Sequence, residues 1–242
     1  MSNVRLGGIA LVVFAIAGIG WFALELTPPR LGFADTDDPA VSLRFLHAHG
    51  VTYAYAGLAL FTMAVSLLVG VLVVSDQLTE SSRSLAAGTT RAIGLTAALF
   101  YFGHGVLRSS VGPMLYIDGL NPSWGESAYL VVQMAGLHGF AQGGILAFSA
   151  WCVLVSIVGA STGRIPRWVV LLGVFPALRL VTSLLGPVGI LEGAGDYVWI
   201  VAMAAIIGSL AWPLGLGSWL LLRKTDARQL QPAAGPGSME LG

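Results

Sequence analysis

Histidine followed by glycine occurs at three widely separated places in this chain, His49, His104 and His138. Neutral imidazole is a common axial ligand of haem, and cofactor sites are often built between the facing helices of a bundle. Glycine beside each histidine removes a side chain where a flat macrocycle would approach the backbone. The recurrence therefore makes haem b the first cofactor to consider.

Further polar side chains join these histidines by helical spacing. Tyr101, His104 and Arg108 follow one another at i, i+3 and i+7, so they share one face of an α-helix. His138 and Gln142 share a face at i and i+4. If the two faces met, an arginine there could also donate charge-assisted hydrogen bonds to haem propionates. The candidate binding residues are therefore His49, His104, His138, Arg108, Arg179, Tyr101 and Gln142.

One short segment, 47–60 (HAHGVTYAYAGLAL), is locally similar to the second span of haem–copper oxidase subunit I. In that family a histidine followed by glycine, at the outer end of the span, binds the low-spin haem. The resemblance implies that His49 is the matching ligand. The family's copper-ligand segment has no counterpart in this chain.

Other chemistries stay open. Three neutral histidines with Glu25 or Glu192 would suit zinc or copper, although no HxxxH or HExxH pair occurs. His47 and His49 point about 200° apart on a regular helix, so they do not form a metal-binding pair. Titratable histidines could also relay protons. Each polar residue could instead be structural, for example a histidine satisfied by a helix carbonyl.

The elements that must position these residues are long apolar blocks. The chain is 56% hydrophobic and 10% charged, whereas soluble domains carry about 25% charged residues. Each block can cross a bilayer, which takes about 20 helical residues, and helices satisfy the backbone hydrogen bonds there. The sequence thus predicts an all-α integral membrane protein, with a six-helix domain at 1–224 and a disordered cytoplasmic tail at 225–242. The spans are expected at about 6–26, 51–75, 91–111, 128–160, 167–187 and 197–222.

Lysine and arginine predict the orientation. Only Arg30 and Arg44 lie in loops opposite the N-terminus, against eight such residues on its own side. Because cytoplasmic loops carry the excess of Lys and Arg, we expect both termini in the cytoplasm, and the cytoplasmic membrane of a bacterium as the location. All the candidate histidines then fall in or at the outer half. The eight residues are Arg5, Arg83, Arg91, Arg164, Arg167, Arg223, Lys224 and Arg228.

Two outer segments carry local signals. Asp38 followed by Pro39 is typical of a helix start, so 39–49 should form a helix that stands above the membrane or lies along its surface, bending near Gly50. The segment 118–127 (DGLNPSWGES) predicts a turn-rich loop.

The function expected from these features is an outward-facing His/Arg pocket, with haem b passing electrons as the leading use. One alternative is an accessory or assembly subunit, because no nucleotide motif or catalytic pattern occurs; another is a small-molecule transporter or receptor. The bilayer is the expected partner, together with another membrane protein or a second copy of the chain. Zero net charge gives no indication of nucleic acid, and the single Cys152 excludes an internal disulfide.

Overall fold

The computed structural model describes residues 3–25, 38–79, 85–185 and 195–223, without the side chains of 25, 79, 85, 137, 138 and 195–199. Within these ranges the chain is helical and contains no strand. The predicted tail 225–242 lies outside them, as do Arg30, Arg83, Glu192, Lys224 and Arg228. The helices are α1 (Asn3–Glu25), α3 (Pro39–Thr79), α4 (Leu85–Ser109), α5 (Val111–Leu120), α6 (Pro122–Gln133), the π-helix η1 (Met134–Ala141), α7 (Gln142–Thr162), α8 (Arg167–Leu172), α9 (Val174–Leu185) and α10 (Gly195–Leu222).

Apolar helices long enough to cross a bilayer support the predicted membrane protein. Among the described residues five stretches qualify by length and composition, and α4 is not one of them. The predicted third span, 91–111, coincides with α4, whose Arg91, His104 and Arg108 lower its apolar content. The five stretches are Asn3–Leu24, Pro39–Leu78, Pro122–Thr162, Arg167–Leu185 and Ile200–Leu222.

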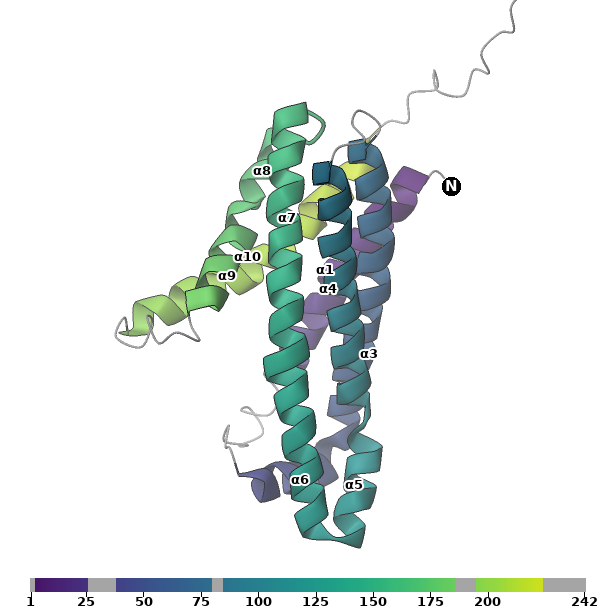
Figure 1. The fold of residues 1–242 in the computed structure, drawn as a ribbon, viewed down its shortest axis with the longest axis vertical. Helices are drawn as coiled ribbons and strands as arrows, with labels where there is room; N and C mark the ends of the chain where they lie inside the picture. Colours follow the sequence, from purple (N-terminus) through teal and green to yellow (C-terminus); the bar gives the residue numbers. More distant parts are fainter. Residues whose placement is uncertain (1–2, 26–37, 80–84, 186–194, 224–242) are drawn as a thin grey trace, which may run out of the picture.

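The long helices form one bundle. In Figure 1, α3, α4 and α7 run along the long axis, while α8, α9 and α10 lean away on one side. Helix α4 packs against both α3 and α7, and α1 packs against α3 and α10. The core includes Trp151 and Trp212, both fully buried, whose rings meet edge to face at 5.4 Å. The Trp212 indole N–H is satisfied because it donates to Ser156 Oγ at 2.9 Å.

A close helix contact joins α1 to α10. A Cβ on Gly8 of α1 would lie 2.9 Å from the Gly217 carbonyl oxygen, and a Cβ on Gly217 of α10 would lie 2.8 Å from that of Gly8. Only residues without a Cβ let backbones approach this closely, as at small-residue contacts between membrane helices.

Two helical rods are far longer than a bilayer is thick. Helix α3 has 41 residues, and the run Pro122–Thr162 through α6, η1 and α7 also has 41. At about 1.5 Å per residue each measures about 60 Å, twice the roughly 30 Å of the hydrocarbon core. Part of each rod must therefore project beyond a bilayer. At one end of the rods, the start of α3 packs with α5 and α6 (Figure 1). We call this end the head.

The head begins as the sequence predicts. The Asp38 carboxylate accepts a hydrogen bond from the Ala40 N–H at 2.9 Å, so it caps a helix that starts at Pro39. The predicted bend near Gly50 is confirmed one residue earlier, where His49 has non-helical φ and ψ of −132° and 23°.

The predicted turn-rich loop at 118–127 is wrong. Helix α5 runs to Leu120 and α6 starts at Pro122, so only Asn121 separates them. The Asn121 side chain caps α6 by accepting the Ser123 N–H at 3.1 Å. Asparagine followed by proline thus starts a new helix here and makes no open loop.

A small core and one polar contact hold the head together. Across it, the His47 Nε2 lies 2.8 Å from the Asp118 carboxylate and ties the start of α3 to α5. The buried residues of its core are Leu43, Leu46, Val111, Met114 and Tyr129.

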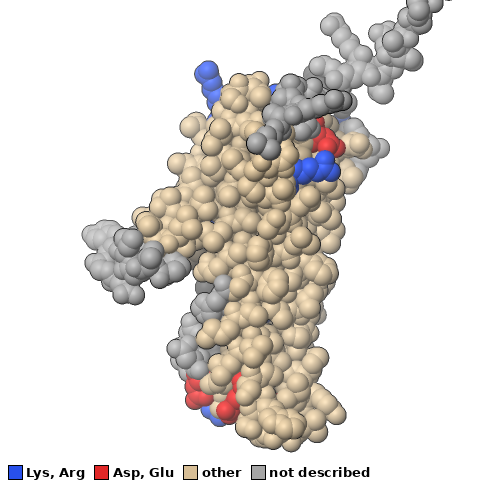
Figure 2. All heavy atoms as spheres, in the orientation of Figure 1, with Lys and Arg blue, Asp and Glu red and all other residues tan. Residues whose placement is uncertain are grey.

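Most charged side chains of the described residues lie at the two ends of the molecule; Arg108 and Arg179 are exceptions within the bundle. Figure 2 shows a broad uncharged belt, with Lys and Arg mainly at the end opposite the head. We call that end the basic end. Asp76 also lies there, 3.6 Å from Arg91. The belt has the surface expected of a protein whose middle faces lipid.

Candidate functional site

Three helix interruptions meet where the head joins the spans. Helix α3 bends at His49, α4 gives way to α5 at Ser110, and α6 changes to the π-helix η1 at Met134. π-Helical turns are frequent at functional sites. A cavity lies between the interrupted helices, and its polar lining residues are Tyr53, His104, Arg108, Tyr129 and Gln133.

His104 is the most unusual of these residues. Its side chain is 0% exposed, and neither ring nitrogen has a hydrogen-bond partner in the described part of the chain. Its ring contacts Trp21 edge to face, with the ring centroids 5.9 Å apart. Each unsatisfied buried polar atom costs about 1–3 kcal/mol, so this imidazole is held in place at the expense of stability.

Arg108 lies one turn further along α4 and is only 7% exposed. Its guanidinium carbon lies 4.9 Å from the centre of the Tyr53 ring, a cation–π contact between α4 and α3. A permanent positive charge therefore lies beside the unsatisfied imidazole, among largely apolar walls.

The space inside this cavity is very small. Its volume is about 10 Å³, whereas a site for one water needs at least about 10–15 Å³. Anything larger than a water could enter only if the walls moved. The three interruptions are places where the backbone can change direction without breaking a continuous helix.

Tyr101 and Arg179 form a second polar group outside this cavity. Tyr101 is buried among aromatic rings, 5.9 Å from Phe14 and 6.4 Å from Phe148 between centroids. The Arg179 guanidinium is close enough to interact electrostatically with Tyr101. Its Nη1 is buried and has no hydrogen-bond partner among the described residues.

The other predicted site residues do not line the cavity in the part of the chain described here. The His49 ring packs on Phe45 at 4.6 Å, at the bend itself. Gln142 is exposed. The side chain of His138 lies outside the described residues, as does that of Glu25. Of the seven predicted residues, the structure thus brings His104 and Arg108 together at this cavity.

A change of helix type explains why Gln142 faces elsewhere. The i, i+4 argument for His138 and Gln142 assumes an α-helix, but both His138 and its neighbours lie in the π-helix η1. Gly136 of η1 faces His104, since a Cβ there would lie 3.7 Å from the imidazole.

Sequence reasoning missed Tyr53, Tyr129 and Gln133. A signal for two of them exists, since Tyr129 and Gln133 are spaced i and i+4 and share a face of α6. Both residues fall inside the predicted span 128–160, so this signal was available from the sequence. Tyr53 carries a similar signal, because it is spaced i, i+4 from the candidate His49.

The described residues do not fit a haem at His104. The space beside Gly103 is filled by the Phe140 ring, and a Cβ on Gly105 would lie 3.2 Å from the Gly57 carbonyl oxygen. These two glycines therefore serve helix packing, and neither leaves open space beside His104. No cluster of three metal-ligating side chains occurs within the described residues either.

No protein-family model matches this sequence, and no curated protein or solved structure is significantly similar to it.

Proposed function

We propose that this chain is a six-span protein of the bacterial cytoplasmic membrane, with both termini in the cytoplasm, that binds a small polar ligand from the outer side. The ligand site is the cavity at His104 and Arg108. The single observation that carries the proposal is the fully buried His104 with two unsatisfied ring nitrogens.

The burial pattern of α4 supports a sixth span. The helix packs along α3 and α7, both of which are apolar enough to span. Its exposed large side chains include the apolar Leu99, Phe102 and Val106. His104 and Arg108 point into the protein, as ionisable residues in membrane helices do.

The charge distribution supports the orientation. Arginines gather at the basic end, where α1 begins and α10 ends (Figures 1 and 2). The positive-inside rule puts that end in the cytoplasm. The head, with the His47–Asp118 contact, then faces the exoplasmic side.

The polar groups at the cavity define the ligand class. A neutral imidazole offers one donor and one acceptor, and a guanidinium offers only donors. Together they suit a small molecule with a carboxylate or carbonyl oxygen for Arg108 and a second polar atom for His104. Movement at the three helix interruptions would admit such a ligand. The protein would then be a receptor, or a transporter that binds its substrate at this site.

Native mass spectrometry of the full chain in mild detergent tests this proposal. We expect a bound non-protein mass on the parent protein that is lost in His104→Leu and Arg108→Met. The matched control is Gln142→Leu, which replaces an exposed polar residue beyond the π-helix and should keep the mass. The same spectrum for all four proteins would contradict the proposal.

Haem b with electron transfer stays a separate prediction. An absorption spectrum of protein from haem-sufficient cells tests it, since a bound haem gives an intense Soret band. A spectrum without that band contradicts haem and leaves the small-ligand proposal intact.

An accessory subunit is the second candidate, and the surface of the head favours it. Tyr116, Leu120 and Trp124 are large, exposed side chains on α5 and α6, beyond the length that a bilayer covers. Exposed apolar patches of this kind mark interaction sites. Migration as a stable monomer after extraction in mild detergent would count against this role.

A further inference from the structure

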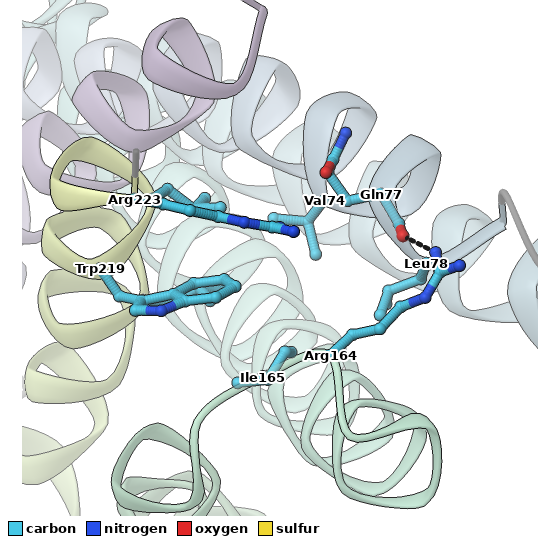
Figure 3. A pocket seen from close by; sticks show the side chains of 9 residues that line it. Val74, Gln77, Leu78, Arg164, Ile165, Trp219 and Arg223 are labelled. Atoms are coloured by element: carbon cyan, nitrogen blue, oxygen red, sulfur yellow. Dashed lines mark hydrogen bonds between the residues drawn. The ribbon is translucent and has the colours of Figure 1, made fainter. Parts of the chain in front are cut away.

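A polar cavity lies at the basic end, far along the bundle from His104. It has a volume of about 250 Å³ and opens between the last turns of α3 and α10 and the connection from α7 to α8. Figure 3 shows Arg164 and Arg223 beside this space, one from the α7–α8 connection and the other from α10. Two guanidinium groups from distant parts of the chain thus meet at one cavity.

Each arginine is held in place by a separate contact. The Arg164 Nη1 donates to the backbone carbonyl of Gln77 at the end of α3, drawn as a dashed line in Figure 3. The guanidinium carbon of Arg223 lies 5.4 Å from the centre of the Trp219 ring. Arginine has five N–H donors, so donors on both side chains are left for a ligand.

The described lining of the cavity carries positive charge, and no carboxylate is among these residues. The nearby Asp76 lies 3.6 Å from Arg91 on the outside of the bundle. Two arginines in such a setting suit a phosphate group, which accepts bidentate charge-assisted hydrogen bonds.

Apart from Gln77, the rest of the described lining is mainly apolar. Val74 and Leu78 come from α3, and Leu216 and Leu220 from α10. A ligand with a phosphate group and an apolar portion would match both parts. Basic pockets between membrane helices at the cytoplasmic side bind phospholipid headgroups by this combination.

We propose that the cavity between Arg164 and Arg223 is a binding site for a phosphate group, carried by an anionic phospholipid or by a soluble phosphate compound. The site is independent of the His104 cavity, and it shares no lining residue with it.

Native mass spectrometry of the full chain, titrated separately with phosphatidylglycerol, phosphatidylcholine and inorganic phosphate, tests the site. We expect tighter binding of phosphatidylglycerol than of phosphatidylcholine. Arg164→Gln and Arg223→Gln should each weaken it about 5-fold and the double variant about 30-fold, at roughly 1 kcal/mol per arginine. Arg223→Gln keeps the Arg164–Gln77 bond, so it reports on the ligand even if Arg164→Gln folds poorly.

The matched control is Arg167→Gln, an exposed arginine three residues from Arg164 that does not line the cavity. It should leave binding unchanged. Dependence on both cavity arginines in the lipid arm identifies a phospholipid, and the same dependence with inorganic phosphate identifies a soluble phosphate. Equal losses for all three arginines would mean general attraction to the basic surface and would overturn the proposal, as would no loss in any variant.

Discussion

Each of two regions of the bundle contains an arginine stacked over an aromatic ring, but one arginine is exposed and the other is buried. Arg223 lies over Trp219 at 5.4 Å at the basic end, and Arg108 lies over Tyr53 at 4.9 Å where the spans meet the head. The cavity beside the first pair measures about 250 Å³, and the cavity beside the second about 10 Å³. Only the second arginine is buried.

Comparing the two regions shows how burial changes the energetics of an arginine–aromatic contact. An exposed guanidinium keeps its hydration whether or not a ligand is present, so the open pocket can stay empty at little cost. A buried charge or imidazole depends on its surroundings for solvation, and the energy of the site then depends on every wall. Substitutions should therefore change the free energy of unfolding strongly at the His104 cavity and weakly at the basic end.

Added volume should give the largest contrast. Gly57 packs against the end of α4, next to Arg108 of the His104 cavity. A Cβ on Gly57 would lie 3.1 Å from the Ser109 backbone nitrogen and 3.2 Å from the Gly105 carbonyl oxygen. Gly57→Leu should lower the free energy of unfolding in detergent by about 3 kcal/mol through overpacking. Gly88 on α4 has open space around it, so Gly88→Leu is the control and should be neutral or stabilising. Equal effects at both glycines would remove the contrast.

His104→Leu should raise stability when no ligand is bound. The substitution removes two unsatisfied buried nitrogens, and we expect a gain of about 2 kcal/mol in the free energy of unfolding. Arg223→Leu at the open end should change it by less than about 0.5 kcal/mol. Thermal unfolding in detergent measures both, and a loss of stability in His104→Leu would mean that the imidazole has a partner in the ligand-free protein.

Double-mutant cycles compare the two cation–π contacts directly. Arg108→Met with Tyr53→Leu should give a coupling energy near 2 kcal/mol, because the pair is removed from water. Arg223→Met with Trp219→Leu should give about 0.5–1 kcal/mol. Coupling of the same size at both ends would show that burial does not strengthen this contact here.

A small effect should also come from the head. His47 and Asp118 are 50% and 19% exposed, and exposed ion pairs contribute about 0.2–1 kcal/mol. His47→Gln should therefore change the free energy of unfolding by less than about 1 kcal/mol. Asp118→Asn tests the same contact from the other side and should match it; a much larger loss in either would show that the head depends on this pair.

Local signals in the sequence predicted several elements correctly. Apolar composition indicated membrane helices, Asp38–Pro39 marked the start of α3, and the bend near Gly50 followed from the length of the segment. The shared face of Tyr101, His104 and Arg108 is buried as expected, because ionisable side chains avoid lipid.

Features that depend on packing could not be read in the same way. Amino-acid composition does not distinguish a π-helix from an α-helix. The sequence analysis therefore did not predict which residues of η1 share a face, or that Gln142 is exposed. The basic-end cavity joins Gln77, Arg164 and Arg223 from three distant segments. In the sequence these arginines fit the positive-inside pattern, and nothing in that pattern indicates a pocket between them.

The close contact of Gly8 with Gly217 bears on how the protein is made. Because α10 follows all the other described helices in the chain, the face of α1 that contacts it has no packing partner until α10 has left the ribosome. During that interval the insertion machinery or lipid must shield this face. A nascent chain that stops after α9 would keep the face open, a state that membrane quality-control proteases could recognise.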